Sequence, residues 1–475
     1  MSPDDGLLTA LSTTEQPPIW QSIRESLAGT RHDYTEGSID RAIVLLAIPM
    51  VLELALESVF AVADVFFVSR IGADAVATVG LTESMLTIIY AFAIGLSVGA
   101  MATVARRIGE KDDDGAARAA VQAIALGFFV AVPAGLAGAF FAPRLLHLMG
   151  APPGVMANSA YTSIMLGMNG VILMLFLINA VFRGAGDAAI AMRVLWFANA
   201  INICLDPCLI FGLGPFPRLG VVGASVATTT GRGIGVLAQL YWLSRGDGRI
   251  VIRRSHLRLD PKVMLNMVRL SGSAVLQSLI GTTSYVGVVR IVAAFGADAL
   301  AGYTIGIRMI IFAMLPSWGM SNAAATLVGQ NLGAGRPERA EVSVWRTALF
   351  NMFFLGGISI VFLVFAPLLV SAFTSDPIVA GHAVRCLRIV SAGFVFYAYG
   401  MVLSQSFNGA GDTMTPTLLN LVCFWMFEIP FAYLLARVIG IGPQGVFWAL
   451  ASAFSLFAVL CAAIFRKGRW KLKQV

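Results

Sequence analysis

Long apolar runs alternate with short polar segments from residue 41 almost to the end of the chain. Each run has about 20 residues or more, which lets a helix cross the ~30 Å hydrocarbon core of a bilayer. Lipid offers no partner for exposed backbone groups, so runs of this length should be helices. The pattern predicts twelve membrane-spanning helices, at residues 42–69, 76–104, 117–142, 157–182, 192–212, 220–244, 263–292, 298–330, 345–372, 384–408, 414–437 and 443–465.

Composition supports a membrane protein and excludes other classes. Hydrophobic residues make up 58% of the 475 positions and charged residues only 12%, whereas a soluble protein carries about 25% charged residues. This excludes a soluble enzyme, a disordered chain and a nucleic-acid binder. The five cysteines include no CxxC pair, so neither a disulfide framework nor a zinc site is predicted. No phosphate-binding loop is found in any polar segment, so direct use of ATP is not expected.

The basic residues predict the orientation in the membrane. Of the 33 Lys and Arg residues, 24 lie in or beside the two tails and the loops that follow even-numbered spans, and six lie on the opposite side. Because basic loops stay in the cytoplasm, both termini are expected there, in a plasma membrane. The segment before the first span is polar. Within it, Ile19 to Leu27 could form a short surface helix with Trp20 at the interface, and a loose tail is the alternative.

An internal repeat divides the chain into two halves. Residues 71–75 recur at 295–299 with an offset of 224, and residues 182–187 recur at 407–412 with an offset of 225. At the offset of 224, Gly95 corresponds to Gly319 and Gly109 to Gly333. Six spans return the chain to its starting side, so both halves should insert with the same topology. We therefore expect an all-α fold of two six-helix lobes, related by a pseudo-two-fold axis along the membrane normal, around a central cavity.

The repeat gives the domain boundaries. We expect a tail (1–40), an N-lobe of spans one to six (41–245), a basic linker (246–262), a C-lobe of spans seven to twelve (263–466) and a basic tail (467–475). Two lobes of this kind can rock against each other and expose a central site to each side in turn. A transporter is therefore favoured over a channel.

Six acidic residues lie inside the predicted spans, and each is a functional candidate, because an ionisable group in hydrocarbon costs at least ~2.5–3.5 kcal/mol. They are Glu53, Glu57, Asp64, Glu83, Asp206 and Glu428. Five of them fall in the first half, together with one arginine inside a span, which gives the N-lobe a formal charge of about −4. A cavity lined by this lobe should attract cations. Glu83 is nearer the outer end of its span and is expected to be a hydrated interfacial group.

Helical spacing places several of these acids together. Asp64, Glu57 and Glu53 are seven and four residues apart, so they share one face of span one. Asn202 and Asp206 lie one turn apart on span five. Two carboxylates in a dry pocket cannot both ionise cheaply, so Asp64 and Asp206 could carry one proton between them near neutral pH. A cationic substrate or sodium would displace that proton, which is sufficient for antiport. Buried structural carboxylates are the alternative.

Several segments resemble multidrug and toxic compound extrusion (MATE) transporters from about residue 38 to 466. The segments that carry the likeness are Ile48-Pro49, 62–68, 185–187, 202–207 and 327–333. The resemblance implies a twelve-helix efflux antiporter that exchanges protons or sodium for organic cations. The Asn-x3-Asp-Pro pattern of span five is similar to a prokaryotic branch whose coupling site lies in the amino-terminal lobe.

The resemblance also implies roles for particular residues. It assigns the coupling carboxylates to Asp64 and Asp206, and completes the cation site, which could hold sodium, with Asn202, Thr228 and Asn179. Pro49 matches a proline whose bend follows protonation, and a static kink is the alternative. Glu53 and Glu57 depart from the family pattern. They could bind a second proton, recognise substrate charge or form structural hydrogen bonds.

Three further expectations concern the C-lobe, the partners and competing functions. Arg308 and Glu428 are expected to form a structural ion pair. The partners should be cationic or amphipathic small molecules and membrane lipids, with no cofactor beyond the coupling ion and no nucleic acid, and the chain is expected to be a monomer. A lipid-linked oligosaccharide flippase would favour a basic central cavity, and an intramembrane transferase would need a catalytic His or Asp cluster. The N-lobe acids and the four scattered histidines favour neither.

Overall fold

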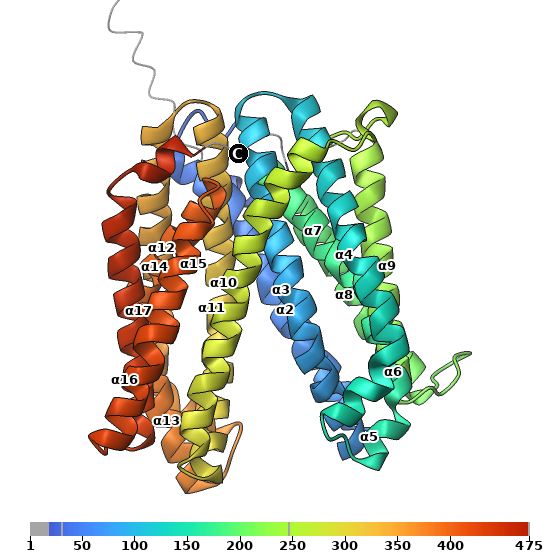
Figure 1. The fold of residues 1–475 in the computed structure, drawn as a ribbon, viewed down its shortest axis with the longest axis vertical. Helices are drawn as coiled ribbons and strands as arrows, with labels where there is room; N and C mark the ends of the chain where they lie inside the picture. The colour runs from blue at the N-terminus through green and yellow to red at the C-terminus, as the bar shows by residue number, and fades with distance from the viewer. Residues whose placement is uncertain (1–18, 30–31, 246–247, 474–475) are drawn as a thin grey trace, which may run out of the picture.

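The computed structural model describes residues 19–29, 32–245 and 248–473, and these contain helices and connecting segments but no strand (Figure 1). The N-terminal half contains α1 (Ile19–Ala28), α2 (Ile39–Ser69), α3 (Ala73–Gly109), α4 (Asp113–Leu148), α5 (Pro153–Ala157), α6 (Ser159–Gly167), α7 (Asn169–Ala185), α8 (Ala188–Phe211) and α9 (Val221–Arg245). The other half contains the 3-10 turn η2 (Arg254–His256), α10 (Pro261–Ala293), α11 (Ala297–Gly333), α12 (Pro337–Ser371), α13 (Pro377–Ala392), α14 (Phe394–Gly409), α15 (Met414–Asn420), the π-helical η3 (Leu421–Glu428), α16 (Ile429–Tyr433), the π-helical η4 (Leu434–Val438), α17 (Pro443–Phe465) and the 3-10 turn η5 (Arg469–Leu472).

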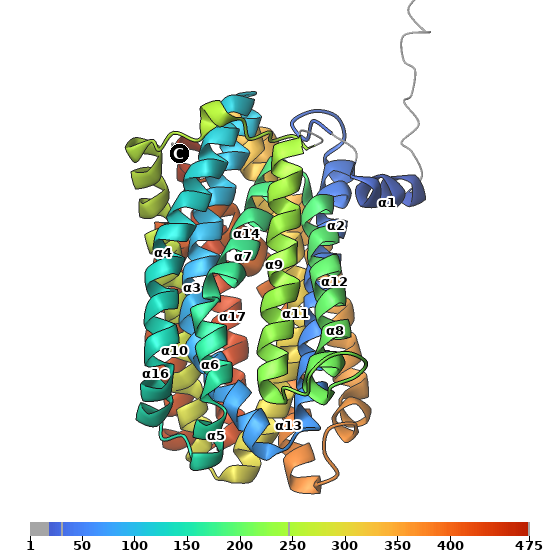
Figure 2. The ribbon, with the colours of Figure 1, turned by 90° about the vertical axis from the view of Figure 1, so that its right-hand side faces the viewer.

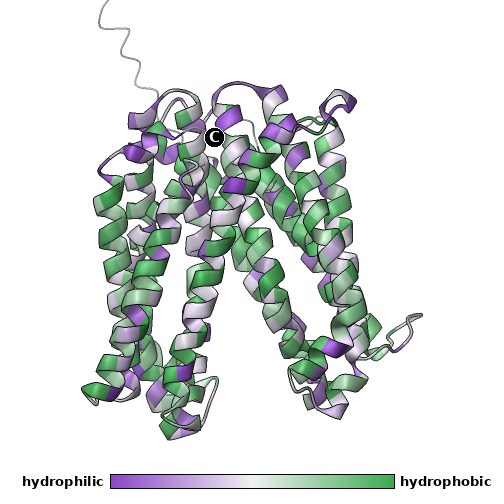
Figure 3. Ribbon diagram, viewed as in Figure 1, coloured by the Kyte–Doolittle hydropathy of each residue, from purple (hydrophilic) through white to green (hydrophobic). Residues whose placement is uncertain are grey.

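These helices account for the twelve predicted spans. In the described part of the chain, nine helices are long and apolar enough to cross a membrane, and two bent pairs raise the number to eleven. The bent pairs are α6 with α7 (40°) and α13 with α14 (59°), which correspond to spans four and ten. The twelfth span is α9, whose apolar sequence is interrupted by three threonines and Arg232. Figure 3 shows apolar residues along the helices and polar residues concentrated at the two ends of the bundle.

The helices form two lobes, each with its own apolar core. One core is built from α10–α17 and their neighbours, and two others lie mainly among α2–α9, one of them including Ile250 and Met267 from the linker and the start of α10. We call the end of the bundle where α1 and η5 lie the terminal side, and the end where α5 and α13 lie the distal side (Figures 1 and 2). The lobes meet at the terminal side and diverge toward the distal side. In agreement, Leu46 and Met50 of α2 are buried, whereas Val62 and Phe66, nearer the distal side, are at least half exposed.

Glycines bring the two lobes into close contact, and they do so symmetrically. A Cβ on Gly109 would lie 2.0 Å from the carbonyl oxygen of Gln330, and one on Gly333 would lie 2.2 Å from that of Arg106. The four residues are two pairs at the repeat offset of 224. Because the same contact occurs twice with the lobes exchanged, the interface has the pseudo-two-fold symmetry that the sequence repeat predicted.

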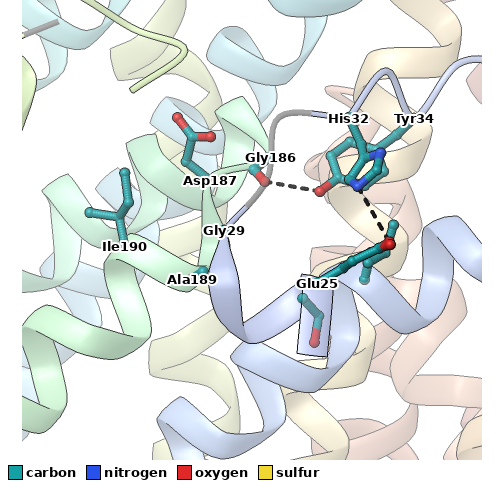
Figure 4. Close-up of a pocket in the computed structure, with 10 residues that line it drawn as sticks. Glu25, Gly29, His32, Tyr34, Gly186, Asp187, Ala189 and Ile190 are labelled. Carbon is teal, nitrogen blue, oxygen red and sulfur yellow. Dashed lines mark hydrogen bonds and ion pairs between the residues drawn. The ribbon is translucent and has the colours of Figure 1, made fainter. Parts of the chain in front are cut away.

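A segment before α2 crosses this interface on the terminal side. We call residues 32–38 the strap. Figure 4 shows its N-lobe end, where the hydroxyl of Tyr34 donates to the carbonyl oxygen of Gly186 at 3.3 Å. On the C-lobe side, Arg336 donates to the carbonyl oxygen of Thr35 at 2.6 Å, and Arg339 donates to the carbonyl oxygens of residues 34, 36 and 37. The strap therefore ties the lobes together where they meet.

Candidate functional site

One face of α2 turns its acidic side chains toward the helices of the N-lobe, as the sequence spacing predicted. Glu53 bonds to α7, Glu57 bonds to α8 and α9, and Asp64 interacts electrostatically with Asp206 of α8. The three carboxylates lie at increasing distance from the terminal side, because α2 begins there at residue 39. Their surroundings differ: Glu53 and Glu57 each bond to an arginine, whereas Asp64 forms no ion pair.

Glu53 is held in a buried network. Its Oε1 accepts from Arg183 at 3.0 Å and from Asn179 at 3.1 Å, and only 2% of the residue is exposed. The Oδ1 of Asn179 in turn accepts from Gln239 at 2.6 Å. An ion pair in such a dry place keeps its charge only because each partner neutralises the other. Glu53 and Asn179 therefore form part of the packing between α2, α7 and α9.

Glu57 has a similar arrangement one turn further along α2. Its Oε1 accepts from Arg232 at 3.1 Å, and its Oε2 accepts from Asn199 at 3.1 Å. The guanidinium of Arg232 also lies over the ring of Phe60, 5.5 Å from its centroid. Both glutamates on this face thus have an arginine partner.

Asp206 has no such partner. It has no exposed surface, and neither carboxylate oxygen accepts a hydrogen bond from any described residue. Beside it on the same helix, Asn202 donates to the hydroxyl of Thr228 at 3.0 Å, which leaves the Oδ1 of Asn202 also without a donor. Burying a charged carboxylate without a partner costs roughly several kcal/mol. Binding of a proton or a cation at Asp206 would remove this cost.

Asp64 is more accessible than Asp206. It is half-buried on α2, and it interacts electrostatically with Asp206, with Glu83 of α3 and with Arg232. We call Asp64, Asp206, Asn202 and Thr228 the aspartate site. It lies in the distal half of the N-lobe, since both aspartates are near the distal ends of their helices.

The structure thus divides the seven predicted site residues into two groups. Four form the aspartate site, and Glu53, Glu57 and Asn179 belong to the paired networks. Sequence reasoning missed Arg183, because span four was predicted to end at residue 182, whereas α7 continues to Ala185. The predicted formal charge of −4 already counted Arg232. Including Arg183 as well makes the formal charge inside the N-lobe about −3. Glu83, expected only as a hydrated interfacial group, lies within electrostatic reach of Asp64.

The expected ion pair in the C-lobe is wrong. Glu428 is buried in η3, and no described arginine forms an ion pair with it. Arg308 is exposed on α11 and interacts with Glu83 of the other lobe instead. Helical position alone could not show this, because Arg308 and Glu428 lie on helices whose facing sides are set by the lobe packing. Pro49 lies in the buried part of α2, which continues as one helix through it.

The chemistry of the aspartate site suits a hard monovalent cation or a proton. It offers only oxygen atoms as ligands: two carboxylates, an amide carbonyl and a hydroxyl. Hard cations prefer such oxygen ligands. No group of three or more His, Cys, Asp or Glu side chains gathers in the described residues in a way that could hold a metal ion. A sodium ion would therefore rely on neutral oxygens besides the two aspartates.

A model of the MatE family matches residues 49–208 and 273–434, once in each lobe. The second match begins 224 residues after the first, which is the offset of the sequence repeat. The chain belongs to the MATE family of transporters. It is a multi-pass membrane protein, as its apolar helices also indicate.

Relatives of this family resemble the chain over nearly its whole length. A probable multidrug resistance protein NorM from Thermotoga maritima is 26% identical, over 92% of this chain and 94% of the relative. A FAD transporter from Shewanella oneidensis is 25% identical, over 91% of this chain and 95% of the relative. Among solved structures, a MOP superfamily transporter from Pyrococcus furiosus, whose binding pocket is described as having reverse polarity, superposes with a TM-score of 0.87 at 25% identity, over 94% and 99% of the two chains.

Proposed function

We propose that this MATE transporter is a secondary antiporter that exports organic cations or other drug-like compounds in exchange for protons or sodium. The observation that carries the proposal is Asp206, a wholly buried carboxylate with no hydrogen-bond donor among the described residues, which interacts electrostatically with Asp64. The name of the Thermotoga relative supports the substrate class. We further propose that the terminal side faces the cytoplasm, in agreement with its basic loops.

Competition for one negative site provides the coupling. With a proton or sodium bound, the aspartate site is close to neutral and holds an organic cation weakly. Loss of that ion restores the charge of Asp64 and Asp206, and the half-buried Asp64 is accessible to a cargo from between the lobes. Because the ion and the cargo cannot both neutralise the same carboxylates, entry of one favours release of the other. Rocking of the lobes would then present the site to each side of the membrane in turn.

The energy available from the coupling ion is adequate for export. Moving one charge through the membrane potential supplies ~2.3 kcal/mol per 100 mV. A tenfold concentration gradient of cargo costs ~1.4 kcal/mol. Exchange of one ion for one monovalent cation moves no net charge, so a tenfold gradient of the ion then supports a tenfold gradient of cargo, and a second ion adds the work of the membrane potential. Hydrolysis of ATP is not needed for this mechanism.

Dye transport in proteoliposomes tests the proposal. A cationic dye should be transported when a proton or sodium gradient is imposed, and Asp64→Asn and Asp206→Asn should each reduce gradient-driven transport at least tenfold, because neither amide can bind the ion. Asp298→Asn, an exposed acid at the start of α11, is the matched control and should transport normally. Normal transport by both aspartate variants would refute the site. If neither gradient drives any cationic dye, the flippase alternative is favoured.

A further inference from the structure

A pocket of about 300 Å³ lies in the C-lobe. Its lining comes from α10 and α11 and combines aromatic, aliphatic and basic groups: Tyr285, Thr304, Ile307, Arg308, Ile311 and Phe312. Tyr285 and Ile311 are each more than 40% exposed, so the pocket is accessible. The predicted aspartate site uses none of these residues.

The charge in this pocket is unpaired. No ion pair joins Arg308 to a carboxylate among the described residues, and the charge of Arg308 acts on Glu83 of α3 from beyond ion-pair distance. Since α3 belongs to the N-lobe, Arg308 faces the region between the two lobes. Figure 1 shows α10 and α11 on the side of the C-lobe that faces α2 and α3. Glu83 in turn interacts with Asp64, so positive and negative groups line opposite sides of one region.

A guanidinium in such surroundings is suited to binding an anion. Arginine presents a planar set of donors that matches a carboxylate or a phosphate with two parallel hydrogen bonds. A cargo packed against the apolar and aromatic side chains beside it would displace water, which strengthens that interaction. Tyr285 and Phe312 offer flat faces to an aromatic cargo.

We infer that the Arg308 pocket is a subsite for an anionic group of the cargo. The cargo class is then an aromatic amphiphile with an amine at one end and a carboxylate or phosphate at the other. Its amine lies toward Asp64 and Glu83, and its anionic group binds Arg308. This inference rests on the proposed export function and narrows its substrate class. The alternative is that Arg308 binds no ligand and only offsets the charge of Glu83 of the other lobe.

Two compounds that differ by a single charge distinguish an anion-binding role of Arg308 from a charge-balancing role. The probes are an aromatic amino acid with an extended ring system, which is zwitterionic, and its methyl ester, which is a cation of nearly the same shape. Binding of each to the purified full-length protein is measured by calorimetry, and transport is measured in proteoliposomes. Arg308→Gln should weaken binding of the zwitterion at least tenfold and leave binding of the ester within about twofold, because hydrogen bonds to charged groups are the strong ones.

Two further variants complete the test. Arg308→Lys keeps the charge without the planar donor set, so it should bind the zwitterion with intermediate affinity. Arg290→Gln removes an exposed arginine from the last turn of α10, outside the pocket, and should change neither affinity.

An equal effect of Arg308→Gln on both compounds, or no effect on either, would overturn the subsite and favour the charge-balancing role. The binding measurement does not depend on transport. If wild-type protein binds the zwitterion through Arg308 but no gradient drives export, then the proposed function fails while the subsite stands.

Discussion

At the level of single residues, partners rather than positions distinguish the acids of this protein. Helical spacing placed Glu53, Glu57 and Asp64 on one face of α2, and the structure confirms that face. The sequence could not show which of them are paired, because their arginine partners come from α7 and α9, more than 120 residues away. It also ended span four one residue before Arg183, since a charged residue at a helix end resembles a boundary.

Removing one partner of the buried pair should destabilise the protein. Arg183→Met leaves the carboxylate of Glu53 buried without its cation, so we expect a loss of about 3–5 kcal/mol in the free energy of unfolding. The double variant with Glu53→Gln should recover much of this loss, because the remaining group is neutral. Equilibrium unfolding in detergent micelles measures both effects.

A surface pair provides the comparison. Arg107 and Glu110 lie 2.8 Å apart with about a third of each side chain exposed, and Arg107→Met should cost less than about 1 kcal/mol. If Arg183→Met were no worse than Arg107→Met, the Glu53 network would not have the structural role assigned to it.

At the level of elements, the sequence predicted the spans well and their ends less well. Twelve apolar runs were sufficient to place the membrane helices, because a bilayer sets their length. The bends at α6–α7 and α13–α14 were not predicted. The repeat identified Gly109 and Gly333 as equivalent, but only the structure shows that each lies against a backbone carbonyl of the other lobe. That contact depends on how two distant helices cross, which no local pattern records.

A methyl group at this crossing should change the balance between conformations. The Cβ of Gly333→Ala would lie 2.2 Å from the carbonyl oxygen of Arg106, so the lobes must separate on the terminal side. Because the lobes move as units, their distal ends should approach each other. Spin labels at the exposed Ala73 and Ala297, measured by pulsed electron resonance, should therefore report a larger population at short distance.

The control is a glycine with open space around it. A Cβ on Gly357 of α12 would meet nothing within 4 Å, so Gly357→Ala should leave the distance distribution unchanged. Identical distributions in wild-type protein and Gly333→Ala would show that this contact does not limit the approach of the lobes.

At the level of the whole molecule, the strap and the lobe interface together hold the terminal side closed. The strap was missed by sequence reasoning, which treated residues 1–40 as a tail, because its bonds run mainly through backbone carbonyls and leave no pattern in the side chains. The helix that the sequence left open at Ile19–Leu27 is formed as α1 and joined to α2 by the pair of Glu25 and Arg41 at 2.6 Å.

The strap should loosen as the pH falls. Burial, and then the charge of Arg41, lower the pKa of His32 from its ordinary value of 6.5, and the weaker attraction of Glu25 at 3.9 Å opposes them. The docked strap therefore favours the neutral imidazole and binds fewer protons than the released strap. Docking should be strongest above the ordinary pKa and weaken as the pH falls through it, levelling off below the lowered pKa.

Hydrogen exchange tests this dependence. After correction for intrinsic rates, the amides of residues 32–38 should be less protected at about pH 5.5 than at about pH 7.5. His32→Gln cannot titrate and should remove the difference. Equal protection at both pH values in the wild-type protein would contradict the assignment.

The central claim is that a coupling ion and an organic cation displace each other at Asp64 and Asp206. The most direct measurement follows ion release while purified protein in weak buffer is titrated with tetraphenylphosphonium, using a pH indicator in one series and a sodium electrode in another. The account predicts release of about one proton or one sodium ion for each cation bound, and no release from Asp206→Asn. Binding of the cation by wild-type protein without release of either ion would contradict it.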